Sequence, residues 1–146
     1  LDLGEKTIGV AASDRGLSLS TPVETIQRRK IGADLVRLGA LAKHRDVKGF
    51  VLGLPLNMDG SKGPRVQITQ SFAHEILKAA AKDRSLFGHI DPPILLWDER
   101  LSTSAVDRFL IDEADLSRKK RAAVVDKMAA SFILQGALDA MANQRG

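Results

Sequence analysis

The sequence predicts an α/β fold built on one mixed, five-stranded sheet with helices on both faces. Two observations favour it: three strand-like segments come first, and helical and strand-like segments alternate after them. Consecutive strands predict an antiparallel meander, whereas strands that alternate with helices predict parallel pairing. The predicted order is βββαβαβα with a further terminal helix, in a single domain over residues 1–146.

The meander occupies the start of the chain. Two strand-like pieces flank a turn at Gly4–Lys6, and the second piece, residues 7–12, is small and β-branched. The Asp-Arg-Gly sequence at 14–16 predicts the next turn. Residues 17–26 predict a third strand, in which Pro22 indicates a bend or an edge position.

Helical and strand-like patterns alternate in the rest of the chain. Leucines at helical spacing predict a helix over residues 31–44, and continuous apolar runs predict buried strands at 49–54 and 94–97. Pro64 predicts the first turn of a helix that ends at about Lys82. Two more helices are predicted, one that begins at Ser102 or Thr103 and buries Val106, Phe109 and Leu110, and one over about 122–142.

Composition narrows the function classes. The absence of cysteine excludes disulfides and thiolate metal sites, and no apolar run approaches the roughly 18 residues of a membrane span. The net charge of +4 is compatible with a polyanionic partner. We expect a cytoplasmic protein. Because the chain begins at Leu1, directly on a strand-like segment, we also expect a few native residues before it.

Three acidic residues stand out by position. Asp2 lies in the first strand, Glu99 follows its neighbour Asp98 at the end of the strand at 94–97, and Asp126 shares a helix face with small and apolar residues. Ligands of open α/β sheets bind beyond the carboxyl ends of the strands. Buried acids that converge need a cation, and Mg²⁺ suits carboxylates and phosphates. Two such ions about 4 Å apart would stabilise phosphodiester cleavage.

Each of these residues also has a purely structural interpretation. Asp2 fits a strand-end acid hydrogen-bonded to the Gly4–Lys6 turn, and Asp126 fits an ion pair with Lys119 or Arg100. Ser102 or Thr103 fits the N-cap of the next helix. The joint pattern of an acid on the first strand, on a later strand end and on the last helix favours a metal site.

The loop after the strand at 49–54 has the composition of a phosphate-binding loop. It is bounded by Gly53 and Gly63, and it is not a Walker loop because no Gly-Lys-Ser/Thr closes it. Its position before a helix N-terminus, with Arg65 nearby, favours a backbone phosphate there. The basic run at 118–121 fits either a solvated helix start or a phosphate-contacting rim.

Four blocks of the sequence resemble the YqgF family of bacterial proteins, also called RuvX. The first runs from Asp2 to Ala11 and the last covers 125–135. The most specific blocks are Gly-Leu-Pro-Leu-Asn-Met-Asp-Gly, which begins at Gly53, and Asp-Glu-Arg-Leu-Ser-Thr, which begins at Asp98. The blocks follow the family's order and span nearly the whole chain.

The resemblance implies an RNase H-like fold related to the RuvC resolvase, and a metal-dependent endonuclease of structured nucleic acid. It implies Asp2, Glu99 and Asp126 as the catalytic and metal-binding residues, with Mg²⁺ or Mn²⁺. Glu99 is favoured over Asp98 because neighbouring strand residues point to opposite faces. RuvC-like sites tend to have a fourth acid, so the number of metals stays open. The residues expected to contact substrate are Lys6, Asn57, Asp59, Gly60, Ser61, Arg65, Arg100, Ser102, Thr103, Arg118 and Lys119.

The implied substrate is the 5′ end of precursor 16S rRNA, with branched DNA such as the Holliday junction as the alternative. The implied partners are nucleic acid and ribosomal precursor particles, for a monomer or a homodimer. Two other functions stay open. The chain fits a nucleic-acid-binding module with little catalysis, and residues 2–7 also resemble the first phosphate motif of the actin–hexokinase superfamily, whose ATPases need two such domains.

Overall fold

The chain forms an α/β structure, as predicted. A computed structural model describes residues 1–57, 59–98 and 118–145, with the backbone alone at 118–124 and 145. The predicted helix that begins at Ser102 or Thr103 lies outside these residues. The described elements are β1 (Asp2–Leu3), β2 (Thr7–Ser13), β3 (Ser20–Gln27), α1 (Ile31–His44), β4 (Phe50–Leu54), α2 (Pro64–Lys82), α3 (Arg84–Phe87), β5 (Ile94–Asp98) and α5 (Arg118–Arg145).

The strands form two sheets. The meander is confirmed: β1, β2 and β3 pair antiparallel in sequence order. The parallel pair is also confirmed, because β4 pairs with β5 from Phe50 opposite Ile94 to Leu54 opposite Asp98. The prediction of one five-stranded sheet is wrong, since the described strands divide into a sheet of three and a sheet of two.

The short β1 strand explains the division. The residue before it, Leu1, links the two sheets: its amino group donates to Val51 O at 2.5 Å and its carbonyl accepts from Gly53 N–H at 3.0 Å. A cavity of about 690 Å³ is lined in part by residues of both sheets, including 10–13 of β2 and 50–51 of β4. Two hydrogen bonds at one residue do not make a continuous ladder, so the sheets stay distinct.

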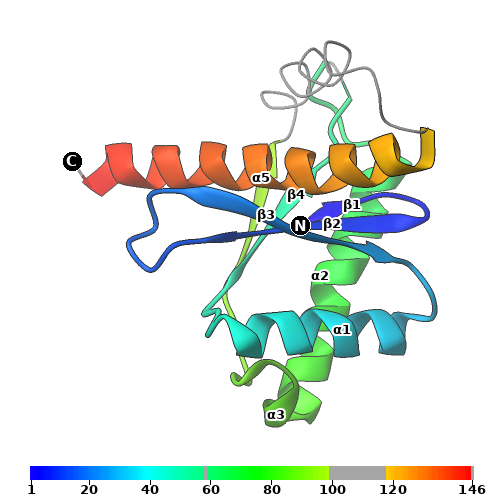
Figure 1. Cartoon of the computed structure of the whole chain (residues 1–146), viewed down its shortest axis with the longest axis vertical. Coiled ribbons are helices and arrows are strands. Elements are labelled where there is room, and N and C mark those ends of the chain that lie inside the picture. Colours follow the sequence, from blue (N-terminus) through cyan, green and yellow to red (C-terminus); the bar gives the residue numbers. More distant parts are fainter. Residues whose placement is uncertain (58, 99–117, 146) are drawn as a thin grey trace.

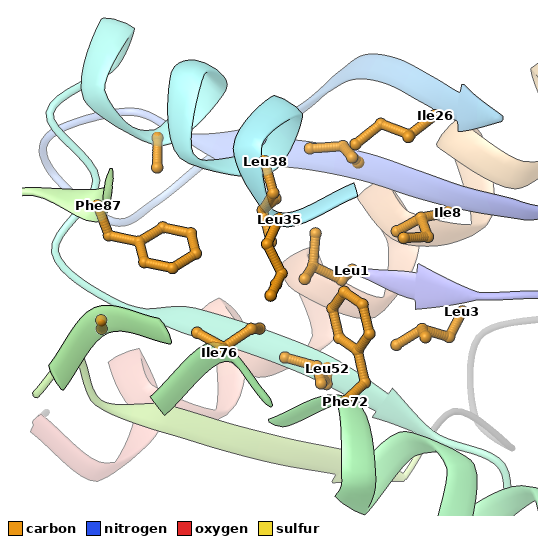
Figure 2. Close-up of a cluster of buried hydrophobic side chains, with 13 residues drawn as sticks. Leu1, Leu3, Ile8, Ile26, Leu35, Leu38, Leu52, Phe72, Ile76 and Phe87 are labelled. Carbon is orange, nitrogen blue, oxygen red and sulfur yellow. The ribbon is translucent and has the colours of Figure 1, made fainter. Parts of the chain in front are cut away.

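The helices cover opposite faces of the strands, as predicted. Helix α5 crosses one face, and α1 and α2 lie on the other (Figure 1). Among the described residues, no helix is long and apolar enough to cross a membrane. On the α1–α2 face, large apolar side chains of the strands and helices meet in one cluster (Figure 2). Its labelled members are Leu1, Leu3, Ile8, Ile26, Leu35, Leu38, Leu52, Phe72, Ile76 and Phe87.

Small side chains bring α5 close to the sheet. Ala130 and Ala137 are fully buried, and Ala129 nearly so. The closest approach is at Gly9 of β2, where an added Cβ would lie 2.0 Å from the backbone oxygen of Asp126. No side chain larger than hydrogen fits between the two backbones at this point. The pattern of small residues therefore sets the depth at which the last helix lies.

Candidate active site

Two of the three predicted acids lie together. Asp2 of β1 pairs with Gly9 of β2, and the backbone of Asp126 in α5 lies directly against Gly9. The charge of Asp126 acts on the carboxyl group of Asp2. Both aspartates are half-buried. The first strand and the last helix therefore bring together two carboxyl groups from opposite ends of the sequence.

A hydroxyl group holds one of these carboxylates. Thr7 Oγ1 donates to Asp126 Oδ2 at 2.5 Å. Thr7 and Gly9 are two residues apart on β2, so they present the same face of the strand to α5. Thr7 was missed in the sequence reasoning, although its position two residues before Gly9 was a usable signal.

The surroundings disfavour the charge on Asp2. Burial raises the pKa of Asp2 above its usual range, the terminal amino group lowers it, Asp126 raises it and Arg65 lowers it, in decreasing order of effect. Desolvation and a like charge both oppose ionisation of a carboxyl group. A hard divalent cation would remove both penalties at once, so this pair of aspartates fits an oxygen-coordinated metal ion.

Arg65 is a predicted substrate-binding residue whose charge acts on one of the acids. It is exposed in the first turn of α2, and its charge acts on Asp2. The N-cap of this helix is Gly63, which makes no side-chain capping bond, and Pro64 follows in the first turn. The first N–H groups of a helix are free to bind an anion when no side chain caps them. In α2, however, Pro64 has no N–H and Val66 N–H donates to Gly63 O at 3.1 Å, so the group that the start of this helix offers near Asp2 is the Arg65 cation.

The loop before α2 is closed by its own hydrogen bonds. Asn57 N–H donates to Ser61 O at 2.9 Å, and Gly60 N–H donates to Asn57 O at 2.8 Å. Asp59 Oδ1 accepts from Ser61 N–H at 2.9 Å and from its hydroxyl group at 2.6 Å. Gly60 has φ +87°, a left-handed conformation that favours glycine. These four predicted residues shape the turn through contacts with one another.

The carboxyl end of β5 leads toward the same loop. Asp98, the last residue of β5, pairs with Leu54, the last residue of β4, from which the loop departs. Asp98 is half-buried and engaged in an interaction. The residues after it, Glu99, Arg100, Ser102 and Thr103, lie outside the described residues, as do the side chains of Arg118 and Lys119.

The described part of the chain does not itself contain a complete metal site. Within residues 1–57, 59–98 and 118–145, no three acidic or histidine side chains gather closely enough to hold an ion. Asp2 and Asp126 provide two acids, and the predicted third, Glu99, is not among these residues. Lys6 is exposed in the turn between β1 and β2, one residue before Thr7.

The chain belongs to the RuvX family. The family model described as "RuvX: Holliday junction resolvase" matches residues 1–140. A Rhodospirillum rubrum protein is 57% identical over 145 residues, which cover 99% of this chain and 84% of that protein. A Rhodopseudomonas palustris protein is 59% identical over the same shares, and a Methylocella silvestris protein is 55% identical over 95% of this chain and 80% of that protein. All three are named "Putative pre-16S rRNA nuclease".

Proposed function

We propose that this protein is a metal-dependent endonuclease that hydrolyses phosphodiester bonds in structured nucleic acid. The observation that carries the proposal is the meeting of Asp2 and Asp126 across Gly9, in surroundings that raise the pKa of Asp2. The substrate we propose is precursor 16S rRNA, processed at its 5′ end in the cytoplasm, because the relatives carry that name. The Holliday junction is the alternative, because the family description names it.

Each of these residues has a proposed role in binding the metal or the substrate. Asp2, Asp126 and Glu99 would hold Mg²⁺ or Mn²⁺, which when bound polarises the phosphoryl oxygens and offsets the charge that develops during cleavage. Thr7 orients the Asp126 carboxylate through its hydrogen bond. Arg65, at the start of α2, would hold a phosphate beside the scissile bond. The Asn57–Ser61 turn would position the start of α2, and not all of its residues would contact the substrate directly.

We also propose that residues 1–146 form one domain with an RNase H-like fold. The supporting features are the antiparallel meander, the adjacent parallel pair and the helix that carries an acid across the meander. An acid on a strand of the antiparallel meander and an acid on the helix packed against it suit a site that holds its metal between two elements.

The decisive test is cleavage by the purified chain and two matched variants. The substrates are precursor 16S rRNA, a four-way DNA junction and plain single strands, each with Mg²⁺, with Mn²⁺ and with a chelator. Asp126→Asn should lower the cleavage rate at least a hundredfold, the scale on which loss of one transition-state contact acts. Asp139→Asn changes an exposed acid of the same helix, bonded to Gln135, and should leave the rate unchanged.

Two results would contradict the proposal. Equal rates for Asp126→Asn and the unmodified protein would remove Asp126 from the site. Metal-independent binding of these substrates without any cleavage would favour the binding module, in which the acids serve the structure alone.

A further inference from the structure

A cluster of four basic residues lies next to the candidate active site. The sequence assigned no role to three of them. The cluster joins two segments: Lys6 in the turn between β1 and β2, and Arg28, Arg29 and Lys30 in the connection from β3 to α1. We call these four residues the basic ridge. By sequence alone residues 28–30 are a short basic connection, and nothing in the sequence shows that Lys6 lies beside them.

Two hydrogen bonds hold the ridge together. Arg28 N–H donates to Lys6 O at 2.8 Å, which extends the pairing of β2 with β3 past Thr7 and Gln27. Arg28 Nη1 donates to Gly4 O at 2.8 Å, so its guanidinium group braces the turn. Arg28 is half-buried, as this structural role requires, whereas the other three cations are exposed.

The exposed cations of the ridge carry charge that the described part of the chain leaves available. The salt bridges among the described residues are Arg37–Glu24, Lys48–Asp46 and Lys78–Glu75, and none involves the ridge. Two acids lie nearby in the chain. Glu5 is exposed in the same turn, and Asp34 is buried and accepts from Arg29 N–H at 2.9 Å. Apart from the two aspartates of the candidate active site, the ridge thus has four cations and two neighbouring acids.

The ridge adjoins the acids through a single residue. Thr7 follows Lys6 directly and donates to Asp126 Oδ2. Gly4, which the Arg28 guanidinium braces, lies two residues after Asp2. The turn that carries Lys6 therefore connects the two strands that hold Asp2 and Thr7.

We propose that the basic ridge binds the sugar–phosphate backbone of the substrate next to the scissile bond, and so sets the path of the nucleic acid across the site. This inference rests on the proposed nuclease function. The ridge and the Gly4–Thr7 turn contain no aromatic residue, so the contact is with phosphates rather than with stacked bases. The ridge therefore contributes affinity and direction without sequence preference.

The test compares two triple variants with the same loss of charge. The first is Lys6→Ala, Arg29→Ala and Lys30→Ala, which leaves Arg28 to brace the turn. The control is Arg15→Ala, Lys43→Ala and Arg45→Ala, which also removes three exposed cations. These residues lie at the C-terminal ends of β2 and α1, whereas the ridge lies at the N-terminal ends of the same two elements. Thermal unfolding first establishes that both variants are folded.

The readout is the salt dependence of binding to a labelled RNA hairpin with a single-stranded tail, measured by fluorescence anisotropy with a chelator present. Each lost phosphate contact lowers the slope of log Kd against log salt concentration by about 0.7 to 0.9. The ridge variant should lose a slope of about 2, and the control should lose none.

The possible results separate this inference from the proposed function. Equal slopes in both variants, with cleavage retained, would contradict the proposed role of the ridge and leave the proposed nuclease function standing. A lower slope in the ridge variant alone supports the ridge, even if the unmodified protein cuts no substrate and the nuclease proposal fails. Absence of hairpin binding by the unmodified protein would overturn both.

Discussion

The two faces of the β1–β3 sheet are packed in opposite ways. On the face of α1 and α2, large side chains such as Leu38, Phe72 and Ile76 fill the space between helix and strand. On the face of α5, Ala129, Ala130 and Ala137 are buried together with Ile133 and Leu138, and at Gly9 the helix backbone lies directly against the strand. Bulky residues bury more apolar area, whereas small residues let two backbones approach.

This difference separates stability from site geometry. The large-residue face contains most of the buried hydrophobic residues among those described, and its side chains do not contact Asp2 or Asp126 in any described interaction. The small-residue face positions the Asp126 backbone and hence its carboxylate. Substitutions on the first face should thus lower the free energy of unfolding, and substitutions on the second should change the site.

The largest expected effect is on the large-residue face. Ile76 is fully buried, so Ile76→Ala should lower the free energy of unfolding by about 2 to 5 kcal/mol through lost burial and the cavity it leaves. The cleavage rate per folded molecule should be unchanged. Urea unfolding and cleavage assays check both, with the exposed Val36→Ala as the control. If Ile76→Ala kept the free energy of unfolding of the unmodified protein but no longer cleaved substrate, the separation of stability from site geometry would be contradicted.

The next effect is on the small-residue face. In Gly9→Ala the new Cβ would meet backbone atoms of Asp126, which cannot rotate away, so α5 must shift. Forced overpacking costs about 1 to 3 kcal/mol. Cleavage should fall further than the loss of folded protein explains, because the Asp126 carboxylate moves with the helix. Retention of full activity per folded molecule would show that the close approach does not position the site.

The pH dependence of stability sharpens the comparison at the site itself. Because burial and then Asp126 raise the pKa of Asp2, the folded protein keeps this proton when the unfolded chain has lost it. Without metal, stability should therefore fall as pH rises from about 4, the ordinary aspartate value, through the raised pKa.

Asp2→Asn should abolish that fall, so the variant should be more stable than the unmodified protein at neutral pH without metal. Mn²⁺ should stabilise the unmodified protein and leave the variant unaffected. Thermal unfolding across pH, with and without Mn²⁺, measures both. A variant whose stability follows the same pH curve as the unmodified protein would remove Asp2 as the source.

The smallest effect is expected at a glycine that has open space where a side chain would be added. Gly32 lies in the first turn of α1, and an added Cβ would have no neighbour within 4 Å. Gly32→Ala should raise the free energy of unfolding by about 0.5 kcal/mol through helix propensity. Urea unfolding measures the change in the free energy of unfolding for both variants. A decrease for Gly9→Ala and an increase for Gly32→Ala would show that the space around the new Cβ decides whether the substitution stabilises. Changes of the same sign would argue against it.

The order of elements was readable from the sequence because it depends on local patterns. The periodicity of leucines at 31–44 and the apolar runs at 49–54 and 94–97 predicted α1, β4 and β5 to within a few residues. The short helix α3 was not predicted, since four residues carry too little periodicity to detect. The acids at Asp2 and Asp126 were selected by the same local reasoning, from their apolar or small neighbours.

Long-range contacts were beyond such reasoning. Whether the two sheets join into a continuous ladder depends on how many residues near β1 pair with β4, and Leu1, which precedes β1, makes two hydrogen bonds to β4. The contact of Thr7 with Asp126 joins residues at opposite ends of the chain. The same is true of the basic ridge, whose members come from two turns.

The sequence by itself determined the α/β class, the described strands and helices other than α3, the RuvX membership and the acidic candidates, because each follows from short-range patterns of residue type. Only the tertiary structure decided which of those acids meet, how closely α5 approaches β2 and that the strands divide into two sheets. The physical reason is that packing depth depends on pairs of residues far apart in the chain, such as Gly9 with Asp126, and neither residue reveals its partner alone.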